Sequence, residues 1–190
     1  SNLIVNTSRT SANGTPLVNT NDGTGKIKGI QTSIKWKKEE FDFFLAYTYL
    51  ESLRQDPSLG EFPSEFDQTH NLNLIASYEL NRWTFSTRLR YVTGGPFTPI
   101  DGAIYDSDTD IYVPIQGEFF STRYDSFFQL DFRIDRKWIY DTWILSAYLD
   151  IQNLTNNANV QSLSYNYDFS DFEETSGLPI LPIFGVKGEF

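Results

Sequence analysis

The sequence predicts an all-β fold, a segment of an antiparallel transmembrane β-barrel. Three observations predict it. Seven segments alternate between apolar and polar residues with a period of two, each spans about ten residues, and the connections between them are short and long in turn. A tilted strand needs about ten residues to cross the hydrocarbon layer of a bilayer. Helices are excluded for these segments, because helical spacing would place charges on every face.

The seven predicted strands are 26–36, 41–50, 71–80, 83–92, 127–135, 143–153 and 180–190. In 41–50, aromatic residues and leucine share one face, whereas Asp42, Ala46 and Thr48 share the other. In 83–92 the apolar side chains are odd-numbered, and Arg88 and Arg90 lie on the opposite face. Each segment therefore has one face suited to an apolar environment and one suited to water.

The last three predicted strands keep this alternation. In 127–135 one face carries Phe128, Leu130, Phe132 and Ile134, and in 143–153 one face carries Trp143, Leu145, Ala147, Leu149 and Ile151. In 180–190, every even position from Pro182 to Phe190 is apolar or glycine, while Lys187 and Glu189 face the other way. The final strand is thus half-buried to its last residue, which suits a closed sheet because such a sheet needs its last strand paired along its whole length.

The connections alternate strictly in length. Short turns are expected at 37–40, 81–82 and 136–142, and long extracellular loops at 54–68, 93–124 and 154–179. Outer-membrane barrels have short periplasmic turns and long outer loops. The final strand then descends and places Phe190 at the periplasmic end. We expect residues 1–23 to be the remnant of an extracellular loop and residues 24–190 to hold the barrel strands.

All four tryptophans flank the three short turns; they are Trp36, Trp83, Trp138 and Trp143. Indole rings favour the boundary between lipid tails and headgroups, so this arrangement predicts an aromatic girdle at one end of the strands. The alternative is that these rings pack at the edge of a soluble β-sandwich.

Charge and composition narrow the possible classes further. The three long loops hold 13 acidic residues and two arginines, a net charge of −11, whereas the whole chain carries −10. The acidity therefore belongs to one surface, which either attracts cations or is a solvated face neutralised by divalent ions. No basic patch is present, so nucleic acid is not an expected partner. The absence of cysteine excludes disulfides and thiolate metal sites.

Several stretches resemble TonB-dependent outer-membrane receptors. Residues 129–138, residues 149–156 and the closing strand that ends in Phe190 are similar to the last three barrel strands of that family. Residues 66–72 and 90–99 are similar to the family's strand entry and loop start. The resemblance extends from about Gly25 to the end of the chain.

The resemblance implies a transporter of the bacterial outer membrane, not an enzyme, and implies no cofactor. Family members have a 22-stranded barrel plugged by a globular domain, and they import scarce nutrients such as metal chelates with energy delivered by TonB. Seven strands cannot close such a barrel, because an open edge in lipid leaves backbone groups unpaired. The chain is therefore expected to be the C-terminal part of a larger receptor, or to meet strands from other chains.

The expected partners follow from the same resemblance. They are the remainder of the barrel and a plug domain in the same or another chain, the TonB complex through that plug, outer-membrane lipids and the insertion machinery. Phe190 is the expected assembly signal, because family members present their terminal strand to that machinery.

A long extracellular loop holds the best candidates for ligand contact. Their aromatic area could grip a chelate or a sugar, or it could pack the loop onto its neighbours. These residues are Tyr105, Tyr112, Phe119, Phe120, Arg123 and Tyr124.

Two further patterns resemble a metal site and a catalytic site. Asp106, Asp108 and Asp110 imitate the opening of a calcium loop, although Ile111 replaces the required glycine and Gly117 stands at the twelfth position; a solvated acidic loop is the alternative. His70 follows Ser64 and Asp67 in sequence, which allows a hydrolase triad or a plain interfacial histidine.

The polar side chains of the strands form a wall of mixed charge inside the predicted barrel. Buried charges are costly without partners, so these groups must meet water, one another or a plug. The wall comprises Arg88, Arg90, Asp131, Arg133, Asp135 and Asp150. In the family they would hold the plug or line the transport path.

Two rival functions stay open at this level. One is a different outer-membrane barrel, such as a porin-like channel or an envelope hydrolase. The other is a soluble β-sandwich that binds carbohydrate through its aromatic loops.

Overall fold

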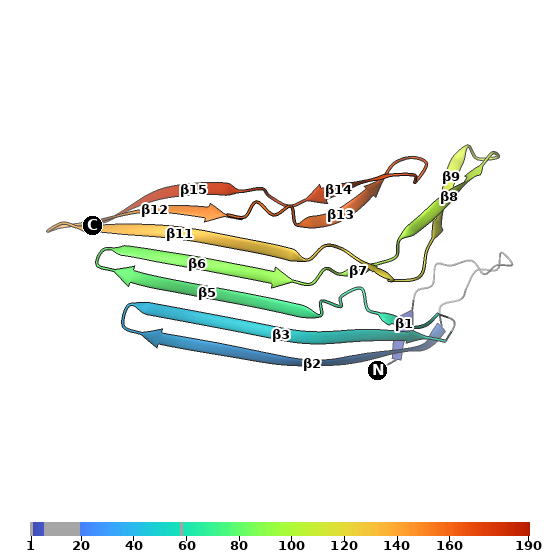
Figure 1. Ribbon diagram of the computed structural model, residues 1–190, viewed down its shortest axis with the longest axis horizontal. Coiled ribbons are helices and arrows are strands. Elements are labelled where there is room, and N and C mark those ends of the chain that lie inside the picture. Colours follow the sequence, from blue (N-terminus) through green and yellow to red (C-terminus); the bar gives the residue numbers. More distant parts are fainter. Residues whose placement is uncertain (1, 6–19, 58) are drawn as a thin grey trace.

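The computed structural model describes residues 2–5, 20–57 and 59–190. These residues form one antiparallel sheet of nine strands and three small two-stranded sheets. Figure 1 shows the large sheet as a single curved layer, with the small sheets β8–β9 and β13–β14 at the end opposite the short turns. The predicted all-β, antiparallel architecture is confirmed. Among the described residues, no helix is long and apolar enough to cross a bilayer.

The large sheet has the strand order β1-β2-β3-β5-β6-β11-β12-β15, and β4 pairs with β3. Its strands are β1 (Asn2–Val5), β2 (Thr20–Lys38), β3 (Phe41–Asp56), β4 (Gly60–Pro63), β5 (His70–Leu80), β6 (Trp83–Val92), β11 (Phe127–Ile139), β12 (Ile144–Gln152) and β15 (Leu181–Glu189). The small sheets pair β7 (Pro96–Phe97) with β10 (Thr122–Arg123), β8 (Ile100–Asp106) with β9 (Ile111–Gln116), and β13 (Val160–Tyr165) with β14 (Phe172–Ser176).

The seven predicted strands correspond to β2, β3, β5, β6, β11, β12 and β15, but two of them are much longer than the apolar pattern suggested. The ladder between β2 and β3 runs without interruption from Thr24–Gln55 to Lys38–Phe41. Backbone hydrogen bonding continues beyond the apolar stretch, because a ladder needs only a neighbouring strand. The cross-strand ion pair between Lys28 and Glu51 (2.7 Å) stabilises this part of the β2–β3 ladder.

The loops of the structure are shorter than predicted, because backbone pairing extends beyond the apolar stretches. Residue 24 lies inside β2, and β1 occupies residues 2–5 of the segment expected to be a loop remnant; residues 6–19 of that segment lie outside the described residues. The expected loop 54–68 contains the end of β3 and all of β4, and the loops 93–124 and 154–179 fold into the small sheets. The turn expected at 136–142 is shorter, because Ile139 still pairs with Ile144.

Strand register gives the sheet two chemically distinct faces. Residues directly opposite each other in an antiparallel ladder point to the same side. The pairs Ile34–Leu45, Leu45–Leu74 and Leu74–Leu89 show how one row crosses four strands without a change of character. The row ends at Leu130 of β11, and beside it on the same face Phe132 pairs with Ile151 of β12, which pairs with Pro182 of β15.

We call the two sides the apolar face and the polar face. The apolar face carries Ile30, Ile34, Trp36, Phe43, Leu45, Tyr47, Leu72, Leu74, Tyr78, Phe85, Leu89, Tyr91, Leu130, Phe132, Ile134, Leu145, Leu149, Ile151, Phe184 and Val186. The polar face carries Gln31, Ser33, Thr48, Asn71, Asn73, Ser86, Arg88, Arg90, Gln129, Asp131, Arg133, Asp135, Ser146, Asp150 and Gln152.

The described residues contain almost no buried hydrophobic core. Phe62 and Val92 are their only buried hydrophobic side chains, whereas Ile30 is 73% exposed and Phe184 is 84% exposed. A soluble β-sandwich buries one face of each sheet against a second sheet. The large sheet has no such partner layer (Figure 1), so this chain is not a sandwich in the described part.

The sheet is open. In the described part of the chain, β15 pairs only with β12, and most of β2 pairs only with β3. Its two outer edges therefore expose backbone groups that need further strands, as expected for a fragment of a larger barrel.

The four tryptophans gather at the end of the sheet that holds the short turns. Trp36 lies near the end of β2, Trp83 begins β6, Trp138 lies near the end of β11, and Trp143 immediately precedes β12. Trp143 stacks on Phe190, with ring centroids 5.7 Å apart. The structure thus brings the terminal aromatic residue and the tryptophans to the same end of the sheet; their role as a membrane girdle stays a prediction.

Gly94, just beyond β6, lies where no side chain fits. A Cβ atom at this position would overlap the carbonyl oxygen of Tyr124, whereas a Cβ at neighbouring Gly95 would have its nearest neighbour, Glu65 O, at 3.7 Å. We therefore expect Gly94→Ala to lower the free energy of unfolding of the full-length protein by about 1–3 kcal/mol through overpacking.

Urea unfolding of the full-length protein in detergent micelles measures this effect. Gly95→Ala is the matched control and should leave the unfolding midpoint nearly unchanged. Equal midpoints for the two variants would contradict the close approach at Gly94.

Candidate functional site

The centre of the polar face is a buried carboxylate. Asp131 is 5% exposed, and Nε and Nη2 of Arg88 both donate to its Oδ2 atom, at 2.9 and 2.5 Å. Its Oδ1 atom accepts bonds from the Gln129 side chain (2.8 Å) and from the backbone amide of Asn153 (2.9 Å). The Asp131 carboxylate of β11 therefore joins the interior of β6 to the end of β12, and all its bonds are charge-assisted.

Asn153 extends this network to the base of the 154–179 loop. Its side-chain amide donates to the carbonyl oxygens of Asn157 (2.9 Å) and Leu178 (3.0 Å), and its Oδ1 accepts from the Asn157 amide (3.0 Å). Its φ of 50° is tolerated because asparagine adopts the left-handed conformation more readily than most residues. The sequence reasoning missed this residue, although the run of asparagines after β12 marks a turn that satisfies its own backbone.

A second ion pair lies on the same face, nearer the short turns. Arg133 forms two parallel bonds with Asp135, 2.8 and 2.7 Å long, and its guanidinium lies 4.0 Å from the ring centre of Tyr148. Arg90 lies over the ring of Phe127 at 5.1 Å. These pairings limit the cost of placing several charges on one wall, because each guanidinium has a carboxylate or a π-face as partner.

Two shallow hollows flank Asp131. One, of about 340 Å³, is lined by Arg88, Asp131, Arg133, Asp150 and Gln152 among others. The other, of about 320 Å³, is lined by Asn71, Asn73, Arg88, Arg90, Gln129 and Asp131. The structure thus brings five of the six predicted wall residues to the hollows, and Asp135 joins them through Arg133.

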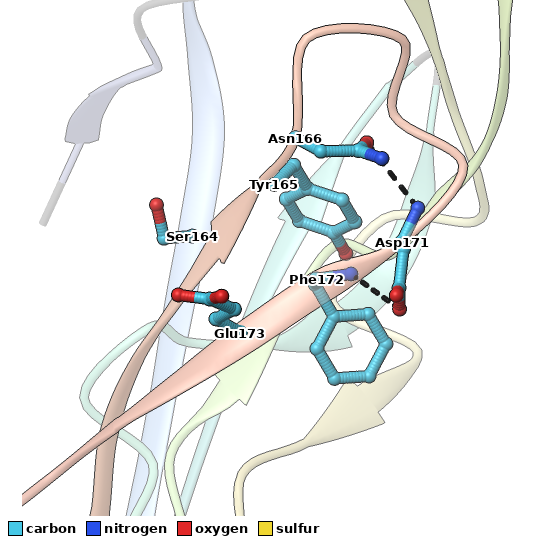
Figure 2. A pocket seen from close by; sticks show the side chains of 6 residues that line it. All are labelled: Ser164, Tyr165, Asn166, Asp171, Phe172 and Glu173. Atoms are coloured by element: carbon cyan, nitrogen blue, oxygen red, sulfur yellow. Dashed lines mark hydrogen bonds between the residues drawn. The ribbon is translucent and has the colours of Figure 1, made fainter.

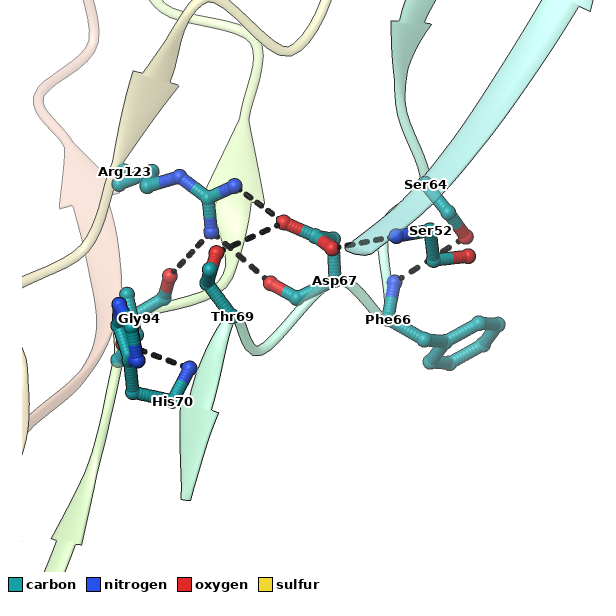
Figure 3. Close-up of polar contacts among 9 residues, drawn as sticks. Ser52, Ser64, Phe66, Asp67, Thr69, His70, Gly94 and Arg123 are labelled. Carbon is teal, nitrogen blue, oxygen red and sulfur yellow. Dashed lines mark hydrogen bonds and ion pairs between the residues drawn. The ribbon is translucent and has the colours of Figure 1, made fainter. Parts of the chain in front are cut away.

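A second buried carboxylate lies in the loop 54–68, just before β5. Asp67 is 2% exposed and forms an ion pair with Arg123. Its Oδ1 accepts the amide of Ser52 (2.7 Å), and Arg123 also donates to the carbonyl oxygens of Asp67 (2.9 Å) and Gly94 (3.0 Å). Figure 3 shows the Arg123 guanidinium inserted between two loop segments. We call this group the Asp67–Arg123 clamp.

The hydrolase triad is not formed. The Asp67 carboxylate is held by Arg123, Ser52 and Thr69, and not by His70. Nδ1 of His70 lies 2.8 Å from the Tyr47 hydroxyl, on the apolar face. Ser64 is buried, and its hydroxyl oxygen faces the amide of Phe66 instead of the imidazole (Figure 3). His70 therefore pairs with a tyrosine on the apolar face and does not form the triad; its position at a membrane interface stays a prediction.

The comparison with known families accounts for both the single-layered sheet and its open edges. Residues 1–154 match the family described as TonB dependent receptor-like, beta-barrel. The chain belongs to this family. The match spans β1 to β12, and β15 extends the same sheet by pairing with β12. No curated protein and no solved structure matches the chain.

Family membership indicates the general architecture and the class of function. The receptor chain is an all-β barrel fragment, and its family is one of transport proteins of the bacterial outer membrane whose barrels work with a plug domain and with TonB. The resemblance seen in the sequence is confirmed.

The six predicted ligand-contact residues of the receptor do not form one site. Phe119 and Phe120 pack on each other and on Phe62, with centroids 4.8 Å apart for Phe62 and Phe119. Tyr124 packs on Phe97 at 4.5 Å, and Arg123 belongs to the clamp. Phe119, Phe120 and Arg123 thus fasten the loop 93–124 to residues outside it, whereas Tyr124 packs within the loop. Ligand contact by these four residues stays a prediction.

Tyr105 and Tyr112 lie apart from the others, as a cross-strand pair on the β8–β9 hairpin. Their ring centroids are 5.2 Å apart, and Tyr167 from the β13–β14 connection packs edge-on against Tyr112 at 5.5 Å. The Tyr167 hydroxyl donates to the carbonyl oxygen of Asp110 (2.5 Å). The hairpins β8–β9 and β13–β14 therefore meet through a tyrosine cluster, and Tyr167 was not among the predicted residues.

The three aspartates of the calcium-like motif do not converge. In the described part of the chain, no group of three or more acidic, histidine or cysteine residues is placed to hold a metal ion. Asp106 accepts the amide of Asp108 (3.0 Å) and the hydroxyl of Thr109 (2.8 Å), and Asp110 accepts the Tyr105 hydroxyl (2.5 Å). The Asp106 carboxylate thus holds the turn of the β8–β9 hairpin and the Asp110 carboxylate pairs with Tyr105, so metal binding by the three aspartates stays a prediction.

A further hollow, of about 250 Å³, lies on the β13–β14 hairpin. Figure 2 shows the side chains of Tyr165 and Phe172 beside Asp171, whose amide is 3.3 Å from the Asn166 side chain. Close by, the Ser170 hydroxyl donates to Asp168 (2.6 Å) and holds the pKa of that carboxyl below its usual value. Aromatic and acidic groups therefore alternate over a surface that the sequence reasoning treated only as loop.

The clamp generates a stability prediction. Asp67→Ala removes the carboxylate from the Arg123 guanidinium, whose side chain is 33% exposed, and from the buried amide of Ser52, so we expect the free energy of unfolding of the full-length receptor to fall by about 1–3 kcal/mol. We also expect limited trypsin digestion to cut the 93–124 loop faster. The matched control is Glu65→Gln, which removes an exposed ion pair with Arg54 (3.6 Å) and should cost less than about 1 kcal/mol. Equal digestion rates for wild type and Asp67→Ala would contradict the clamp.

The hairpin turn generates a pH prediction. The bond from Thr109, with that from the Asp108 amide, lowers the pKa of the Asp106 carboxyl. A lowered pKa adds stability that is fully present above the ordinary value, about 4, and is lost as pH falls through the lowered one. We expect Thr109→Val to raise the pKa of Asp106, so that the turn opens at a higher pH during acidification.

Carbon-13 NMR titration of labelled aspartate carboxyls in the full-length receptor measures this pKa, with Asp106→Asn used for assignment. Thr109→Ser keeps the hydroxyl and should titrate as wild type does. An unchanged pKa in Thr109→Val would show that the hydroxyl has no such role.

Proposed function

We propose that this chain forms part of the barrel wall of an outer-membrane transporter that imports a small, scarce ligand such as a metal chelate. The observation that carries the proposal is the separation of the two faces, which the register preserves from β2 to β15. An apolar face this exposed requires lipid, and a polar face this charged requires water or protein partners.

The orientation follows from the two ends of the sheet. Short turns and tryptophans gather at one end, which we assign to the periplasm, and the acidic hairpins gather at the other, which we assign to the cell surface. Phe190 then lies at the periplasmic boundary, where the insertion machinery would recognise it as the assembly signal.

The polar face is proposed to line the lumen. Arg88, Arg90 and Arg133 balance Asp131, Asp135 and Asp150, so the wall has charges of both signs. The two hollows beside Asp131 offer guanidinium, carboxylate and amide groups to a plug domain or to a passing ligand. We propose that the plug and the remaining strands come from the same or another chain, and that TonB acts through the plug.

Ligand capture is proposed for the extracellular hairpins. Tyr105 and Tyr112, with Tyr167 beside them, present aromatic area on a surface that carries most of the acidic residues. Such a surface suits a ligand with aromatic or sugar-like groups and positive or neutral charge.

The test is growth of the host under iron limitation. A strain without the full-length gene should fail to grow when iron is supplied as one neutral or cationic ferric hydroxamate, and the wild-type gene should restore growth; the anionic ferric catecholates and ferric citrate are the comparison. The restored growth should disappear in a strain that also lacks TonB, because import against a gradient needs its energy.

Two results would contradict the proposal. Uptake that persists without TonB would favour a porin-like channel. A protein that fractionates with the soluble proteins, and stays in solution without detergent, would remove the membrane placement altogether.

A further inference from the structure

Arg136 has an unusual position for a charged residue. It lies near the end of β11, directly opposite Trp83 of β6 and Ala147 of β12, and therefore on the apolar face. The other charged residues of β11 that the register places all lie on the polar face, as the neighbouring Lys137 does. A cation among apolar rows needs a specific partner, because desolvation of an unpaired charge is costly.

The described residues supply aromatic contacts for the Arg136 charge but no hydrogen-bond acceptor. The Arg136 guanidinium lies 4.6 Å from the ring centre of Trp83 and 4.9 Å from that of Trp138. Its Nε atom is buried without a hydrogen-bond partner, and no carboxylate among the described residues forms an ion pair with it. Two π-faces stabilise the charge, but a guanidinium also carries five N–H donors that require acceptors.

The missing part of the barrel cannot supply the acceptor by pairing. The open edges of the sheet are β2 and β15, whereas Arg136 lies on β11, between β6 and β12, which are both present. The strands that would close the barrel therefore join the wall elsewhere. Whatever meets Arg136 approaches the apolar face from outside the sheet.

The position along the strand indicates which group that is. Trp83 is the first residue of β6, and Trp138 is next to the last residue of β11, so the three side chains lie at the end where the tryptophans gather. Indole rings mark the boundary at which lipid tails meet headgroups, and phosphates lie at that level. Arginine is well suited to phosphate, because its planar fork donates several hydrogen bonds to the phosphate oxygens.

We propose that Arg136, flanked by Trp83 and Trp138, binds the phosphate of one glycerophospholipid of the periplasmic leaflet. The acyl chains of this lipid would lie along Ile134 and Phe85, which pair directly on the apolar face. The inference rests on the membrane placement and orientation in the proposed function. The phosphate accepts hydrogen bonds from the terminal amino groups of the guanidinium, which are not buried as Nε is, and its single negative charge balances that of Arg136.

Native mass spectrometry of the full-length receptor in a neutral detergent tests the site, with dioleoyl phosphatidylglycerol as the probe. We expect wild type to bind one lipid with a dissociation constant about tenfold lower than that of Arg136→Gln, since a charge-assisted hydrogen bond is worth about that factor. Lys137→Gln removes a charge from the same strand on the opposite face, and it should bind as wild type does. Dioleoylglycerol, which has the same chains and no phosphate, should not distinguish wild type from Arg136→Gln.

Three outcomes would overturn the inference: equal affinity of wild type and Arg136→Gln, an equal loss in Lys137→Gln, or displacement of the lipid by millimolar inorganic phosphate, which would indicate a general anion site. Tighter binding of lipid A than of phosphatidylglycerol would also overturn it, because it would place Arg136 in the outer leaflet. If Arg136→Gln does not fold, Arg136→Lys replaces it. Lysine keeps the charge without the planar fork, so Arg136→Lys should bind phosphatidylglycerol more weakly than wild type and Lys137→Gln do. If Arg136→Lys binds the lipid as tightly as wild type does, the fork does not recognise the phosphate.

Outer-membrane fractionation and the heat-dependent gel mobility of the wild-type receptor separate the two levels of the argument. A receptor absent from the membrane fraction would end the proposed function and this inference together. A correctly inserted receptor whose lipid binding ignores Arg136 would end only this inference.

Discussion

The pairing of backbone amides and carbonyls between neighbouring strands is the constraint on which the rest of this structure depends. In lipid these groups have no water to bond with, so every strand must lie beside another and stay in register with it. A shift of one residue would exchange the two faces. Uninterrupted ladders, such as the one from Phe41–Tyr78 to Tyr49–His70, therefore determine both where the apolar rows lie and which charges share the polar face.

Once the register is set, two buried carboxylates organise the ends of the strands. Asp131 and Asp67 are built alike: each accepts a backbone amide with one oxygen and an arginine with the other. Each also joins segments far apart in sequence, because the partner arginines lie 43 and 56 residues away. The hydrophobic effect contributes little at these places, since the described residues hold almost no apolar core. Charge-assisted hydrogen bonds to these two carboxylates hold the loops in place instead.

The sequence allowed the strands, the two faces and the open sheet to be predicted, because period-two alternation is a local property. It did not reveal the extension of β2 toward Thr20, where the alternation fades but the ladder continues. Nor could it show that Arg123 belongs to Asp67, or that Tyr167 reaches Asp110 across 57 residues, since these contacts depend on how the loops fold back. Arg136 was readable in principle, because its even number places it in the row of Ile134, but its meaning needed the neighbouring strands.

The placement of the two carboxylates has a consequence for how such proteins can diverge. Asp67 and Asp131 hold the loops at their bases, whereas the tips of the β8–β9 and β13–β14 hairpins contact each other through one tyrosine cluster. Substitutions or insertions at the tips therefore leave the ladders and the anchoring bonds intact. The same barrel strands can therefore carry hairpins of many different sequences, and ligand preference can change through substitutions in the hairpin tips while the barrel stays the same.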